Sequence, residues 1–96
     1  MSKNIRWLRI ALADLDDLMT YIAKDNPEAA NKVARMIWEA TRILSDHPAM
    51  GRPGRVTGTR ELVISGTYYI VPYRVKTDEV QILRVLHAAR KWPEKF

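Results

Sequence analysis

The sequence predicts a single α+β domain in which a short N-terminal strand and an antiparallel helix hairpin pack on an antiparallel sheet of three to four strands. Apolar residues follow helical spacing in the first half of the chain and alternate in the second half. Glycines and prolines gather between the two halves, where a connection is expected. A chain of 96 residues can bury one core, so we expect one domain over residues 1–96.

The composition is basic and contains no cysteine. The formal net charge is +5 and the isoelectric point is about 9.8, which favours an acidic partner such as nucleic acid, the ribosome or an acidic protein segment. The absence of cysteine excludes disulfides, thiolate ligands and thiol nucleophiles, and two histidines do not favour a metal site, so we expect no metal and no cofactor. No apolar run is long enough to cross a bilayer and the N-terminus does not resemble a signal peptide, so a cytoplasmic protein is expected.

Two helices are predicted after a short strand at residues 4–9, whose partner in the sheet the sequence does not identify. The first helix is expected from about Ala11 to Ala23, because apolar residues recur there at positions i, i+3, i+4 and i+7. Three aspartates lie near its positive N-terminal end, where we expect them to face solvent; a catalytic carboxylate cluster is less favoured, since no base accompanies them. These aspartates are Asp14, Asp16 and Asp17.

The second helix is predicted from Pro27 to about Ser45, with Asn26 as its N-cap. The connection between the helices is so short that they should form an antiparallel hairpin. Trp38 lies beside the apolar stripe of this helix, so we interpret it as edge packing, with contact to a partner as the alternative.

Residues 48–58 are predicted to form a loop, because they carry most of the glycine and proline. A phosphate-binding loop would follow a strand and precede a helix, whereas here a helix precedes and a strand follows, so a nucleotide site is not favoured. Arg52 and Arg55 in this loop suit either phosphate contact or solvation.

Three strands should then form an antiparallel meander: residues 59–65, residues 68–75 and a final strand that starts at Val80. The final strand is apolar on both faces, so we expect it in the interior of the sheet. Pro72 falls in the middle strand of the meander, where proline removes a ladder donor, so a bulge is expected there. His87 and the residues after it, up to Trp92, either present functional chemistry at the strand end or are a structural imidazole with solubilising charge.

Taken in order, these segments resemble the ParE/RelE superfamily of toxins from type II toxin–antitoxin modules. The resemblance covers nearly the whole chain and rests on motifs that are specific only in combination. They are A-x-x-D-L-x-x-L-x-x-Y-I (Ala11 to Ile22), N-P-E-A-A (Asn26 to Ala30), H-P-x-x-G-R (His47 to Arg52), G-x-R-E-L (Gly58 to Leu62), Y-I-x-x-Y-R-V (Tyr69 to Val75) and R-V-L-H-x-x-R (Arg84 to Arg90).

The resemblance implies a growth inhibitor that a small ParD-like or RelB-like antitoxin neutralises by wrapping around it, so a hetero-oligomer is expected. RelE-like members cleave mRNA on the ribosome, with cations at the scissile phosphate and a C-terminal tyrosine or histidine for proton transfer. Many of them carry a catalytic arginine in a Y-R-x-x-Y segment, where this chain has Ile70. A ribonuclease site would therefore need other candidates, namely His87, Arg60, Arg84 and Arg90.

ParE-like members are associated with poisoning DNA gyrase by binding. The final R-V-L-H-x-x-R motif and the apolar middle strand resemble this branch better, so we expect a ParE-like toxin. The alternatives are a RelE-like ribosome-dependent mRNA endonuclease and a non-toxic adaptor that binds nucleic acid. We also expect the segment from His87 to Pro93 to serve activity rather than folding. The residues expected to contact the target are Arg52, Arg55, Arg60, His87, Arg90, Lys91 and Trp92.

Overall fold

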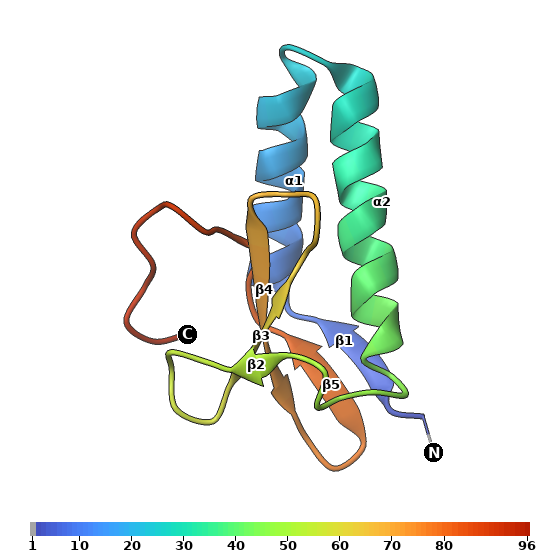
Figure 1. Ribbon diagram of the computed structural model, residues 1–96, viewed down its shortest axis with the longest axis vertical. Coiled ribbons are helices and arrows are strands. Elements are labelled where there is room, and N and C mark those ends of the chain that lie inside the picture. Colours follow the sequence, from blue (N-terminus) through green and yellow to red (C-terminus); the bar gives the residue numbers. More distant parts are fainter. Residues whose placement is uncertain (1) are drawn as a thin grey trace.

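A helix hairpin packs on one face of a six-stranded mixed sheet (Figure 1). The computed structural model describes residues 2–96. The strand order is β1-β5-β4-β3-β2, and β6 also pairs with β4. The elements are β1 (Asn4–Trp7), α1 (Arg9–Ala23), α2 (Pro27–Ile43), β2 (Arg52–Pro53), β3 (Arg60–Val63), β4 (Tyr69–Val75), β5 (Glu79–Ile82) and β6 (Leu86–His87). The predicted α+β fold is confirmed, although the sheet has more strands than expected.

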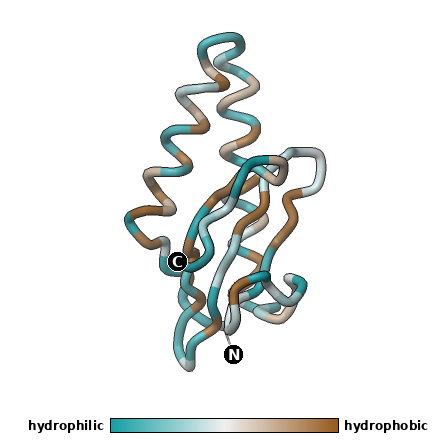
Figure 2. Tube along the Cα trace, turned by 90° about the vertical axis from the view of Figure 1, so that its left-hand side faces the viewer, coloured by the Kyte–Doolittle hydropathy of each residue, from teal (hydrophilic) through white to brown (hydrophobic). Residues whose placement is uncertain are grey.

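The helix hairpin follows the sequence prediction closely. The Asn26 side chain accepts a hydrogen bond of 3.1 Å from the backbone N–H of Ala29, so it caps α2 as expected. Helix α1 begins at Arg9, two residues earlier than predicted, and α2 ends at Ile43, two residues before the predicted end. The hairpin tip projects beyond the sheet in both views (Figures 1 and 2). Among the residues from 2 to 96, no helix is long and apolar enough to cross a membrane.

Strand β1 corrects the prediction of a wholly antiparallel sheet. It pairs in parallel with β5, with Asn4 opposite Glu79 and Trp7 opposite Ile82. The helices and the strands β2 to β4 lie between β1 and β5 in the chain, and this long crossover is what parallel pairing requires. Strand β5 lies between β1 and β4, so its interior position was predicted correctly.

The predicted final strand is divided into β5 and β6 by residues 83–85. Tyr73 on β4 pairs with Ile82, whereas Ile70 pairs with Leu86, so residues 71–72 on β4 face residues 83–85 across the ladder. Two residues of β4 therefore face three residues of the other strand, so the extra residue of the bulge lies in segment 83–85, opposite Pro72, and not in the strand that contains Pro72. The carbonyl of Pro72 accepts a hydrogen bond of 3.0 Å from the N–H of Leu83. This bulge also places Val85 in the same core cluster as Ile82, although simple alternation assigned them to opposite faces.

The core lies between the hairpin and the sheet, where apolar positions of all the long elements meet (Figure 2). Ile37 and Leu44 of the α2 region, Val71 of β4 and Val80 of β5 are fully buried in it. Trp38 stacks on Trp7 with ring centroids 5.4 Å apart, which agrees with the interpretation of edge packing. The sheet is thus held from one side by the helices, and the site described next lies where α1 meets β6.

Candidate functional site

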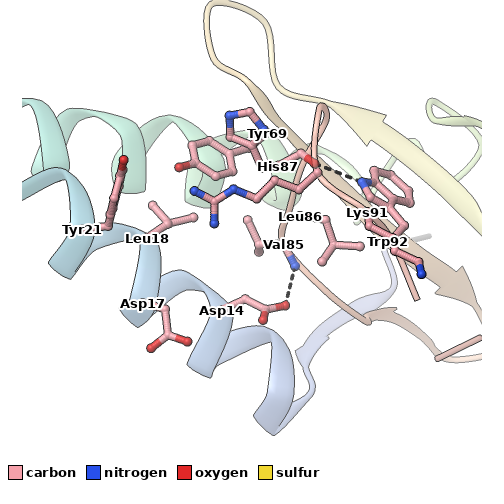
Figure 3. Close-up of a pocket in the computed structure, with 11 residues that line it drawn as sticks. Asp14, Asp17, Leu18, Tyr21, Tyr69, Val85, Leu86, His87, Lys91 and Trp92 are labelled. Atoms are coloured by element: carbon pink, nitrogen blue, oxygen red, sulfur yellow. Dashed lines mark hydrogen bonds between the residues drawn. The ribbon is translucent and has the colours of Figure 1, made fainter.

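A hollow of about 370 Å³ opens between α1 and the end of the chain (Figure 3). One wall is a face of α1 that carries Asp14, Asp17 and Tyr21, which are spaced by three and four residues and therefore point the same way. The opposite wall includes β6 and the residues after it. The remaining lining residues are Leu18, Tyr69, Val85, Leu86, His87, Arg90, Lys91 and Trp92. The structure therefore brings together four of the predicted target-contact residues: His87, Arg90, Lys91 and Trp92.

Asp14 fastens α1 to the bulge beside the hollow. Its carboxylate accepts hydrogen bonds from Arg84 Nε at 2.7 Å, from Arg84 Nη2 at 3.0 Å and from the backbone N–H of Val85 at 3.0 Å. These charge-assisted bonds raise the pKa of Arg84 above its ordinary value, although burial acts in the opposite direction. Asp14 is thus half-buried and paired, which corrects the expectation that it faces solvent.

The imidazole of His87 contacts two tyrosine rings, and one of its ring nitrogens already accepts a hydrogen bond. Its Nδ1 accepts a hydrogen bond of 3.1 Å from the backbone N–H of Ala89. A backbone N–H can only donate, so the neutral ring carries its proton on Nε2 and presents a donor. The ring of Tyr68 stacks on it at 5.7 Å with an interplanar angle of 19°, and the ring of Tyr69 meets it edge-on at 5.6 Å.

Arg90 and Lys91 are exposed at the rim of the hollow and form no ion pair within residues 2–96. The guanidinium of Arg90 lies 5.8 Å from the centre of the Tyr21 ring. Tyr21 is itself 62% exposed, so this contact holds Arg90 only weakly. Both cations therefore remain available to an acidic partner.

Trp92 ties the C-terminal segment to the loop between β2 and β3. Its indole Nε1 donates to the carbonyl of His87 at 3.0 Å (Figure 3). The guanidinium of Arg55 stacks on its ring at 3.6 Å. Trp92 therefore packs on the fold, and the expectation that the segment from His87 to Pro93 serves activity rather than folding stays a prediction.

Glu61 organises the loop arginines. It is 3% exposed and accepts hydrogen bonds from Arg52 Nη2 at 3.0 Å and from the backbone N–H of Arg55 at 2.8 Å. The side chain of Arg55 also lies 3.7 Å from its carboxylate. A buried carboxylate needs such partners, so these two arginines stabilise the Glu61 carboxylate in the loop and are not free to bind an external phosphate.

Arg60 and Tyr73 fasten the preceding segment. Arg60 donates to the carbonyl of Gly51 at 2.7 Å. The Tyr73 hydroxyl donates to the carbonyl of Pro48 at 2.8 Å and accepts from the N–H of Gly51 at 2.8 Å. Burial raises the pKa of the Tyr73 phenol, and the Gly51 hydrogen bond and the charge of Arg60 only partly oppose this. Tyr73 is thus a structural phenol.

Sequence reasoning missed the α1 wall of the hollow and the tyrosines around His87. The spacing of Asp14, Asp17 and Tyr21 on one helix face was the available signal. Tyr69 pairs with His87 across β4 and β6, and Tyr68 directly precedes it, a neighbourhood that only the fold reveals. Within residues 2–96, no group of three histidine or acidic side chains is placed to hold a metal ion.

Comparison with known proteins gives consistent matches. A family model described as ParE toxin of type II toxin-antitoxin system, parDE, matches residues 5–92. The chain is 49% identical over 92 residues to Y4kP of Sinorhizobium fredii, covering 96% of this chain and 95% of the relative. It is 38% identical over 87 residues to toxin RelE2 of Caulobacter vibrioides, covering 91% and 97% of the two chains.

Two solved structures share the fold. A chromosomal ParDE toxin–antitoxin system from P. aeruginosa superposes with a TM-score of 0.80 and 35% identity, covering 90% of this chain and 96% of that one. The toxin–antitoxin complex RelBE2 from Mycobacterium tuberculosis gives a TM-score of 0.60 and 29% identity, covering 91% and 99%. Both are toxin–antitoxin assemblies, and the ParDE system is the more similar of the two.

Proposed function

The chain belongs to the ParE toxin family of type II toxin–antitoxin systems, and from that premise we propose that it arrests growth by binding DNA gyrase. The contact surface is formed by His87, Arg90, Lys91 and Trp92 at the rim of the hollow. The reaction of the target is blocked by binding, without bond cleavage by the toxin.

The observation that carries this proposal is that three of the four ribonuclease candidates, His87, Arg84 and Arg60, are already engaged within the protein, which leaves Arg90 without a base or a second arginine beside it among these candidates. Metal-free cleavage of RNA requires a base with a free lone pair and cations free to meet the phosphate. His87 Nδ1 is occupied by the N–H of Ala89, Arg84 is held by Asp14, and Arg60 donates to a backbone carbonyl. Ile70, in the position of the catalytic arginine, is 5% exposed in the sheet.

The greater similarity to the ParDE system than to the RelBE2 complex supports the same branch. The two exposed cations Arg90 and Lys91 also agree with a binding surface, since charges that are not paired within the protein can form ion pairs with a partner. Arg52, Arg55 and Arg60 are engaged by partners within the protein, which makes them supports of the fold rather than contacts of the target.

A cognate antitoxin, ParD-like or RelB-like, is proposed as the partner that neutralises the toxin in a hetero-oligomer. Apolar side chains of α1 support this: Ile10, Leu12 and Tyr21 are 51%, 47% and 62% exposed. Ile10 and Tyr21 line separate hollows of the described structure, and exposed apolar side chains beside such hollows are positions on which a partner segment can pack. An acidic, amphipathic antitoxin segment would complement both this surface and the net charge of +5.

Growth and enzyme assays test the proposal together. Expression of the chain should arrest growth, and co-expression of its cognate antitoxin should restore it. The purified toxin should inhibit supercoiling by gyrase and should leave mRNA uncut in primer extension on translating ribosomes. The double variant Arg90→Ala, Lys91→Ala should lose inhibition, while Lys32→Ala, which removes an exposed cation on α2, should retain it.

The ribonuclease alternative makes the opposite prediction. Ribosome-dependent cuts that vanish in His87→Ala, with gyrase unaffected, would overturn the proposal. Equal inhibition by the double variant and the wild type would show that gyrase is bound by another surface.

A further inference from the structure

The imidazole of His87 has one nitrogen that the fold does not use. Its Nδ1 accepts a hydrogen bond of 3.1 Å from the backbone N–H of Ala89, so the neutral ring carries its proton on Nε2. Within residues 2–96, Nε2 has no hydrogen-bond partner, and no side-chain nitrogen or oxygen without a partner is buried in this part of the chain. The Nε2–H group is therefore a free donor that solvent can reach.

The surrounding structure holds this donor in place. The carbonyl of His87 accepts hydrogen bonds from the N–H of Arg90 at 3.2 Å and from Trp92 Nε1 at 3.0 Å. Tyr69 pairs with His87 across β4 and β6, and its ring meets the imidazole edge-on at 5.6 Å. A donor that is fixed before its partner arrives loses little conformational entropy on binding.

The hollow that His87 lines has the chemistry for an anion on an apolar stem (Figure 3). Leu18 and Leu86 supply apolar walls. Arg90 and Lys91 line the same hollow and form no ion pair within residues 2–96. The volume of about 370 Å³ leaves room for one amino-acid side chain. Such a side chain would rest its methylene groups on the leucines and bring its charge to the donor and the cations.

The α1 wall favours a single carboxylate over a chain of phosphates. Asp17 on this wall is exposed and unpaired within the described residues. Its charge repels a polyanion that would cross the hollow with several negative charges. One carboxylate can lie at the wall of His87 and leave Asp17 in water. Asp14 adds no repulsion of this kind, because Arg84 neutralises its charge.

We propose that the hollow receives a carboxylate side chain of gyrase, which accepts a hydrogen bond from His87 Nε2 and pairs with Arg90. This inference rests on the proposed function and adds the chemistry of the contact: His87 serves as a fixed donor and not as a base. A hydrogen bond to a carboxylate is stronger than one between neutral groups. Its loss should therefore weaken binding about tenfold or more.

Two substitutions separate the donor from the turn that holds it. Counted in bonds from Cα, the amide nitrogen of glutamine takes the place of Nε2, whereas the amide oxygen of asparagine takes the place of Nδ1. His87→Gln thus keeps the donor and loses the acceptor for Ala89, and His87→Asn does the reverse. Surface plasmon resonance on immobilised, DNA-free gyrase measures the affinity of the intact toxin. His87→Asn should bind about tenfold or more weakly, and His87→Gln should recover most of the affinity. His47→Gln, at an exposed histidine after α2, should bind like the wild type.

Each outcome decides the inference. Weak binding by His87→Asn with recovery in His87→Gln supports it, and equal affinities of the two variants would overturn it. Binding that requires added DNA would assign the anion to a phosphate and would also overturn it. Should thermal unfolding show that His87→Gln does not fold, a cycle of His87→Asn with the exposed Arg90→Gln decides instead: two donors to one carboxylate should give non-additive losses, and additive losses would overturn the inference.

Inhibition of supercoiling by the same wild-type preparation keeps the proposed function apart from this inference. A toxin that inhibits gyrase but fails the comparison of His87→Asn with His87→Gln would leave the proposed function standing. A toxin that does not bind gyrase, with or without DNA, would refute the proposed function and this inference with it.

Discussion

Replacing Asp14 with alanine should destabilise the protein far more than its place on a surface helix suggests. Three hydrogen bonds of 2.7 to 3.0 Å converge on this carboxylate. Hydrogen bonds to charged groups contribute about 1.5–3 kcal/mol each. The Arg84 and Asp14 side chains are 21% and 15% exposed, so solvent screening lowers that sum. We therefore expect a loss of about 2–4 kcal/mol in the free energy of unfolding, which includes the cost of leaving Arg84 unpaired.

This loss is large for so small a domain, whose total stability is expected to be roughly 5–14 kcal/mol. A loss near 3 kcal/mol would lower Tm by about 12–24 °C. Urea and thermal unfolding followed by circular dichroism measure both quantities. The matched control is Asp17→Ala, one turn later on the same face of α1, which should cost less than about 0.5 kcal/mol because Asp17 is exposed and forms no ion pair within residues 2–96.

A double-mutant cycle with Arg84→Ala isolates the interaction from other effects of each substitution. The coupling energy should exceed about 1 kcal/mol, since the pair is bidentate and half-buried. A coupling below about 0.5 kcal/mol, or equal losses for Asp14→Ala and Asp17→Ala, would show that the contact is an ordinary surface ion pair. The fastening of the bulge to α1 would then be refuted.

Three further predictions concern the core and the C-terminal segment. Burial raises the pKa of the Tyr73 phenol, so as the pH rises above about 10 the unfolded phenol ionises before the native one does. The free energy of unfolding should then fall more steeply with pH for the wild type than for Tyr73→Phe, by up to about 1.4 kcal/mol per pH unit. Parallel curves from pH 9 to 11 would contradict this. Gly51→Ala should cost about 1–3 kcal/mol in urea unfolding, because a Cβ there would lie 2.6 Å from the Tyr73 hydroxyl; an unchanged midpoint would show that the loop yields. Truncation after Ala89 should lower Tm by several degrees, since Trp92 leaves Arg55, whereas the double variant Arg90→Ala, Lys91→Ala should not; equal Tm values for both would refute an anchoring role of Trp92.

Local patterns were sufficient to predict the helices and the order of the elements. The apolar spacing of α1 and α2 and the capping side chain of Asn26 depend on residues within one or two turns of each other. The interior position of β5 was predicted from a longer strand with two apolar faces. In the structure β5 buries Val80 and Ile82 on one face and carries the half-buried Glu79 and Gln81 on the other.

Contacts between distant segments could not be predicted in the same way. Asp14 and Arg84 are 70 residues apart in the chain, and nothing near either residue identifies the other. The bulge after Ile82 depends on how two strands align across Pro72, and the two-residue strand β2 exists because Arg52 and Pro53 find Glu61 and Arg60 as partners. The hollow was missed for this reason: one wall comes from α1 and the other from the chain end.

Pairing also divides the predicted target contacts into two groups with different consequences. Arg52 and Arg55 share the buried carboxylate of Glu61, and Arg60 serves the carbonyl of Gly51. A cation that is already paired gains less from a new anion, because it must first give up its partner, and a buried partner left alone is costly. Substituting these arginines should therefore lower stability first and activity only as a result. Exposed, unpaired cations carry no such cost, so a target should draw most of its binding from the two that follow His87, and a plot of activity against Tm should separate the two groups.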